Sequence, residues 1–245
     1  MGLSDFKSSN PAFTSYFWDG ENKSSSKMTI SGIFIKSLTS ILIIAFVTFC
    51  IWRLHADGYD VTWYSLGGII ASIILSVAIS YKNHWAPVIV PLYAIAQGCF
   101  LGAFSAFIKD KFPDMPYQAI GVTIVTFFVM LILYQTRIIK VTQKLRSVII
   151  TASITIGVVY LISWILAFFD IKTFIWGTSW LAIIFTAVSA IVASFALLLD
   201  FDYIEKHKNT AEKSKEWLAT WGLLVTLVWL YIEVLRLMQK LAIRF

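Results

Sequence analysis

Long apolar runs alternate with short polar stretches along most of the 245-residue chain. A helix that crosses a membrane needs about 20 mainly apolar residues, and seven runs reach this length. The runs are continuous and lack the strict alternation of a membrane β-barrel, so they predict helices. The pattern therefore predicts an all-α, polytopic membrane protein with seven transmembrane helices. The predicted spans are Ile30–Trp52, Val61–Tyr81, Ala86–Ile108, Tyr117–Thr136, Ser147–Phe169, Phe174–Leu199 and Trp217–Leu241.

The polar stretch before the first run divides the chain into two parts. Residues 1–29 are rich in Ser, Asn and Lys, which is typical of a polar N-terminal tail. The loops between the apolar runs are short and leave no room for a soluble domain. We therefore expect residues 30–245 to form one seven-helix transmembrane domain.

The composition agrees with a membrane protein. Hydrophobic residues make up 58% of the chain and charged residues only 14%, whereas a soluble domain carries roughly 25% charged residues. The formal net charge of +6 could indicate nucleic-acid binding. However, the basic residues cluster in short loops between apolar runs, which is the pattern of membrane topology. We therefore expect a lipid bilayer, and no nucleic acid, as a partner.

The positions of Lys and Arg predict the orientation. With the N-terminus inside, twelve of these residues fall on the cytoplasmic side and seven on the other side, and Lys36 lies within the first span. Cytoplasmic segments carry the excess of basic residues, so this count favours a cytoplasmic N-terminus. The basic C-terminal end is the feature that argues against it. We expect a multi-pass protein of the cell (inner or plasma) membrane.

Small residues mark faces on which helices could approach one another. Gly98 and Gly102 form a GxxxG pattern in the third span, and Gly67, Gly68 and Ala71 lie close together in the second. Small residues of this kind let helix backbones pack closely in membranes. We interpret both sets as packing faces.

The sequence offers little for catalysis. The three histidines, His55, His84 and His207, lie in different loops, and none is at ligand spacing from another His or Cys. No phosphate-binding GxxxxGK[ST], no HExxH and no GxSxG pattern is present. We expect no catalytic residue, no resident metal and no cofactor, and therefore no enzyme.

Two acidic residues at membrane depth are the main candidates for function. Asp200 ends the sixth apolar run, and Glu233 lies inside the seventh. An acidic group at this depth costs roughly 2.5–3.5 kcal/mol, so it usually faces a protein interior or a water path. Asp202 points about 200° away from Asp200 around a helix and cannot share its face.

Three further polar residues lie near these carboxylates. Lys36 stands about two turns into the first span and could reach Asp200 at the inner interface. Arg236 follows Glu233 by three residues and can pair with it, either beside a pathway or only to neutralise it. Thr226 lies on the same helix stripe as Glu233, nearer the middle of the membrane. We predict an ion pathway lined by Asp200, Glu233 and Thr226, with Lys36 and Arg236 as supporting ion-pair partners.

Three stretches of the chain resemble one known family. They are Ser9–Phe13 (Ser-Asn-Pro-Ala-Phe), Leu197–Ile204, in which an Asp follows an apolar triplet, and Trp229–Leu237. The chain resembles the Bax inhibitor (TMBIM) family in its bacterial YccA-like branch, and the resemblance covers nearly the whole length. It implies six helices around a central last helix. It also implies calcium leak across the membrane, gated by pH through one aspartate on the sixth helix and one on the seventh.

The resemblance assigns the first of these aspartates to Asp200 but leaves the second open. Alignment on Leu235-Arg236 places Thr226 at its position, whereas alignment on the carboxylate places Glu233 there. The two alternatives lie about two helical turns apart.

Two functions from different classes follow from this sequence. The first is a pH-sensitive calcium (cation) leak channel, in which calcium is the transported ion and finds oxygen ligands along the pathway. The second is a non-conducting membrane regulator that binds other membrane proteins, such as a membrane protease. The two acidic groups at membrane depth favour the channel.

Overall fold

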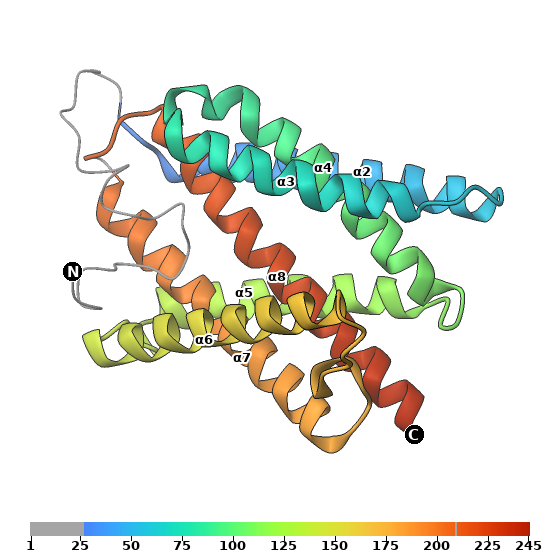
Figure 1. The fold of residues 1–245 in the computed structure, drawn as a ribbon. Coiled ribbons are helices and arrows are strands. Elements are labelled where there is room, and N and C mark those ends of the chain that lie inside the picture. Colours follow the sequence, from blue (N-terminus) through green and yellow to red (C-terminus); the bar gives the residue numbers. More distant parts are fainter. Residues whose placement is uncertain (1–26, 209) are drawn as a thin grey trace. The chain divides into compact units, whose positions relative to one another are not determined.

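The computed structural model describes residues 27–208 and 210–245, and this part of the chain is built of helices (Figure 1). The predicted motif Ser9–Phe13 lies outside the described residues. Within them no strand is present, and Lys27 and Glu212 form one isolated β-bridge. The helices are α2 (Ile30–Ala56), α3 (Thr62–Tyr81), η3 (Asn83–Trp85), α4 (Ala86–Lys109), α5 (Met115–Gln135), α6 (Gln143–Ala167), η4 (Phe174–Trp176), α7 (Trp180–His207) and α8 (Lys215–Arg244).

The prediction of a helical protein with seven spans is confirmed. Seven helices in the described part of the chain, α2 to α8, are long and apolar enough to cross a membrane. Large apolar side chains such as Phe46, Trp63 and Phe128 are exposed on their surfaces, as expected where lipid replaces water as the solvent. Among these seven helices α8 is the most buried: 72% of its most apolar part is buried, compared with 61% in the span Asn83–Lys109 and 11% in α2.

The sixth span begins later and ends later than the apolar pattern predicts. The predicted span Phe174–Leu199 begins as the short helix η4, and α7 starts only at Trp180. Gly177 is extended, and the Ser179 hydroxyl accepts a hydrogen bond from the Ala182 N–H at 3.3 Å, which caps the new helix. Helix α7 then continues to His207, so Asp200 lies inside a helix rather than at its end.

The chain forms two compact units. The α2–α4 unit contains residues 27–113 together with Ile204–Val225. The α5–α6 unit contains Asp114–Tyr203 together with Thr226–Phe245. Each of the last two long helices, α7 and α8, contributes one end to each unit.

Glycines set the closest helix contacts within the α2–α4 unit. A Cβ atom added at Gly98 would lie 2.7 Å from the Cβ of Val47, and one added at Gly102 would lie 2.8 Å from the Cβ of Ile51. Only glycine lets α4 approach α2 this closely, which confirms the predicted packing role of the GxxxG pattern.

A buried carboxylate ties the start of α8 to the start of α2 in the same unit. Glu216 has no exposed surface and accepts hydrogen bonds from the backbone N–H and the hydroxyl of Thr29, both at 2.9 Å. The Lys36 ammonium donates to its other oxygen and lies 5.5 Å from the centre of the Trp217 ring. Gly32 leaves the space for this carboxylate, since a Cβ there would overlap it.

Replacing Gly32 with alanine should therefore destabilise the protein. The methyl group would displace the Glu216 carboxylate from Thr29 and Lys36, and breaking a buried ion pair costs about 3–5 kcal/mol. The thermal unfolding of Gly32→Ala in detergent should occur well below that of the unaltered protein.

Gly67→Ala is the matched control, because no atom lies within 4 Å of a Cβ added at Gly67 in the same unit. Its unfolding temperature should stay the same or rise slightly, since alanine favours the helix more than glycine does. Equal unfolding temperatures for the two variants would contradict the role of Gly32.

Candidate ion site on the last two helices

Asp200 meets Thr226 where α7 passes α8 in the α5–α6 unit. The Thr226 hydroxyl donates a hydrogen bond of 2.5 Å to the Asp200 carboxylate. Asp200 is completely buried, and Thr226 is 3% exposed. The residues before Asp200, Leu197–Leu199, are also buried, so the carboxylate follows an apolar turn of its own helix. The structure thus brings together two of the predicted pathway residues.

Asp202 lies on a different face of α7 and contacts a different helix. Its carboxylate accepts a hydrogen bond from the Arg146 guanidinium of α6 at 2.6 Å. The two aspartates therefore have different partners, as their spacing of two residues predicts.

Glu233 lies two turns further along α8 and is held by neutral donors. It is 1% exposed and accepts hydrogen bonds from the Tyr160 hydroxyl at 2.9 Å and from the Trp229 indole N–H at 3.1 Å. The Arg236 guanidinium stacks near two aromatic rings, 5.1 Å from the centre of Tyr160 and 5.0 Å from that of Trp176. This is cation–π geometry, and it places Arg236 beside the Tyr160 that binds Glu233.

Lys36, predicted as a supporting residue, has Glu216 as its carboxylate partner within the α2–α4 unit. Glu216 was not among the predicted residues, because it stands one residue before the seventh predicted span, among the charges of a loop. The only sign of it in the sequence was Lys36, the single lysine within the first predicted span, because a lysine at membrane depth needs a carboxylate partner.

Lys240 is a second buried charged residue that the sequence pattern did not single out. This lysine is 8% exposed, and its ammonium donates to three oxygens of the α5–α6 unit. They are the carbonyl oxygen of Ile175 at 2.8 Å, the carbonyl oxygen of Ala182 at 3.2 Å and the hydroxyl of Thr186 at 2.7 Å.

These contacts define the register of α7 against α8. Thr226 contacts Asp200 near one end of the shared segment, and Lys240 contacts Thr186 near the other, so the helices run antiparallel. Both pairs are separated by fourteen residues along their helices, or about 21 Å at 1.5 Å per residue. This is about two thirds of a hydrocarbon core roughly 30 Å thick.

Ser189 lies on the segment of α7 between these contacts. Its side chain has no exposed surface, and its hydroxyl has no hydrogen-bond partner in residues 27–208 and 210–245. Eleven residues separate it from Asp200, which places both on nearly the same helix face. We define the polar track as six buried polar residues of the facing segments of α7 and α8: Thr186, Ser189, Asp200, Thr226, Glu233 and Lys240.

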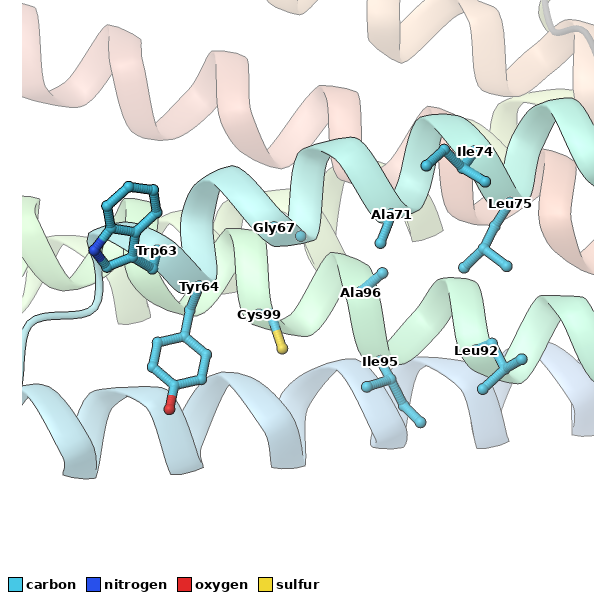
Figure 2. A pocket seen from close by; sticks show the side chains of 11 residues that line it. Trp63, Tyr64, Gly67, Ala71, Ile74, Leu75, Leu92, Ile95, Ala96 and Cys99 are labelled. Atoms are coloured by element: carbon cyan, nitrogen blue, oxygen red, sulfur yellow. The ribbon is translucent and has the colours of Figure 1, made fainter.

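A pocket in the α2–α4 unit has a different character (Figure 2). It lies between α3 and α4 and is lined by apolar and aromatic side chains, including Trp63, Tyr64 and Leu92, with Gly68 and Cys99. Such a lining suits an acyl chain better than an ion. Within the residues that the structure describes, no three His, Cys, Asp or Glu side chains lie together in a group that could hold a metal ion.

The fold and this site define a multi-pass membrane protein with a buried acidic site on its last two helices. Residues 10–243 match the family described as Bax inhibitor 1 like, and the chain belongs to this family. No curated protein matches the chain. No solved structure matches it either.

The contact between Asp200 and Thr226 can be tested by removing one hydroxyl. Thr226→Val keeps the shape but leaves the carboxylate without this donor, and losing a hydrogen bond to a charged group costs about 1.5–3 kcal/mol. Thr226→Ser keeps the donor and should behave like the unaltered protein. Chemical unfolding of the three proteins would measure the difference, and a Thr226→Val protein as stable as Thr226→Ser would contradict the contact.

Proposed function

We propose that the chain is a pH-sensitive calcium (cation) leak channel of the cell membrane. In this proposal the polar track carries the ion, with Asp200, Thr226 and Glu233 lining its path. The observation that carries the proposal is the complete burial of Asp200 against Thr226 on two membrane-spanning helices. A carboxylate at this depth is costly, so such groups are rare and often mark an ion or proton path.

The oxygen atoms along the track support the proposal further. Calcium prefers hard oxygen ligands, and the track supplies the carboxylates of Asp200 and Glu233 and the hydroxyls of Thr226 and Ser189. The unpartnered Ser189 hydroxyl has a lone pair for a passing ion or its water. Membership of the Bax inhibitor 1 like family agrees with the calcium leak that the resemblance implies.

The resemblance also implies pH gating through two aspartates, and the geometry bears on which residue stands for the second. Thr226 occupies the position beside Asp200, whereas Glu233 binds Tyr160 and Trp229. We infer that a single carboxylate, Asp200, is the proton-sensitive group, with Thr226 as its permanent donor. Protonation of Asp200 removes the negative charge that attracts a cation, so flux falls as the pH is lowered through its titration.

Calcium flux into liposomes that contain the purified protein tests this function. Asp200→Asn keeps the size of the side chain and removes its charge, so we expect roughly tenfold lower flux and a flattened dependence on pH. Asp202→Asn is the matched control. It leaves Arg146 without its carboxylate and lowers stability, but folded protein should leak as before.

Equal effects of the two substitutions on flux would contradict the assignment of Asp200. A folded, unaltered protein that leaks neither calcium nor other cations at any pH would favour the alternative function, a non-conducting regulator that binds other membrane proteins.

The proposal includes a cytoplasmic N-terminus, which rests on the positions of Lys and Arg. With Cys50 and Cys99 replaced by alanine, single cysteines at Gly58 and Lys213 should react with an impermeant reagent from opposite sides of the membrane. In intact cells only the cysteine at Gly58 should be labelled from outside. Outside labelling at Lys213 and not at Gly58 would reverse the orientation.

A further inference from the structure

Lys240 occupies a site that has the chemistry of a cation-binding site. Its ammonium is held by two carbonyl oxygens, those of Ile175 and Ala182, and by the hydroxyl of Thr186. We name these three oxygens the oxygen cage. Thr186 has no exposed surface, and its hydroxyl donates to the Ala182 carbonyl at 2.9 Å, which orients its oxygen lone pairs toward Lys240.

The ligands of the oxygen cage are all neutral. Carbonyl and hydroxyl dipoles that replace the hydration shell are also what selectivity filters offer to monovalent cations. The two charged side chains that act on Lys240 electrostatically, Arg236 and Glu233, lie on its own helix. The cage thus stabilises a positive charge by dipoles, and the ammonium of the chain itself fills it.

The position of the oxygen cage determines where the positive charge of Lys240 lies relative to the polar track. Lys240 is seven residues beyond Glu233 on α8, about 10 Å along the helix axis. It therefore places a fixed positive charge at the end of the polar track, while Asp200 and Glu233 lie further along. A cation that followed the track would meet this like charge and be repelled by it.

We propose that the oxygen cage is a monovalent-cation site filled by the tethered ammonium of Lys240, which restricts cation passage along the track. The restriction rests on the proposed leak function, whereas the cation site does not. The side chain acts as a built-in blocking ion, and its removal leaves a site for potassium or a small alkylammonium ion.

A purely structural clamp is the competing explanation, and Arg244 provides the comparison. Arg244 also ties the end of α8 to the segment before α7, because its guanidinium donates to the Thr178 carbonyl at 2.9 Å and lies 4.2 Å from the centre of the Trp180 ring. Arg244 is exposed, so it lies outside the buried cage. Arg244→Gln removes a clamp and a positive charge without emptying the cage.

Binding is tested first, on purified protein in detergent. Lys240→Ala removes the part of the side chain that corresponds to propylammonium, so its thermal unfolding temperature should fall. Propylammonium or potassium should restore it, whereas tetramethylammonium, which has no N–H donor, should not. Unaltered protein and Arg244→Gln should not respond. A Lys240→Ala protein that responds equally to all three cations, or to none, would overturn the cation site.

Flux is tested second, with Lys240→Gln in liposomes. This substitution keeps an N–H donor for the cage and removes the charge, so the fold survives even if Lys240→Ala does not fold. Potassium and calcium flux should rise about tenfold or more, with Arg244→Gln unchanged. If the unaltered protein leaks and Lys240→Gln leaks at the same rate, Lys240 does not restrict cation passage, and this part of the proposal is overturned. If none of the proteins showed flux but propylammonium still raised the unfolding temperature of Lys240→Ala, the leak function would be rejected. The cation site would remain supported.

Discussion

Hydrocarbon offers no hydrogen-bond partner, so a charged group of α7 or α8 at membrane depth is costly unless it finds a partner within the protein. Asp200 binds Thr226, Glu233 binds Tyr160 and Trp229, and Lys240 binds the oxygen cage. The contacts of Asp200 with Thr226 and of Lys240 with Thr186 fix the antiparallel register of α7 and α8. A slip of one residue would rotate one helix by about 100° against the other and separate both pairs.

The partners of these charged groups are mostly neutral. A hydroxyl bonded to Asp200 stabilises the carboxylate without cancelling its charge, whereas an arginine in the same place would form a closed ion pair, as Arg146 does with Asp202. The two aspartates, only two residues apart, thus differ in the chemistry of these donors, a hydroxyl for Asp200 and a guanidinium for Asp202.

The sequence alone predicted what depends on length and local pattern. Continuous apolar runs predicted seven helices, the GxxxG pattern predicted a packing face on α4, and helical spacing separated Asp200 from Asp202. It could not predict partners that come from distant elements. Glu216 and Lys240 stand at the ends of predicted spans, where charges are common, and Tyr160 is one aromatic residue among many. The break at Gly177–Ser179 was missed because apolar residues continue on both sides of it.

The placement of Thr226 beside Asp200 also changes how pH would act on the proposed pathway. Two adjacent carboxylates repel each other when both are ionised, so they share one proton and titrate as a coupled pair. Thr226 has a hydroxyl in place of a second carboxylate, so the contact between Asp200 and Thr226 is not a coupled pair of this kind. Glu233 lies two turns away on the same stripe of α8 and binds Tyr160 and Trp229 instead. In the proposed channel, the response to pH should therefore depend on Asp200 itself and not on a proton shared with the residue beside it.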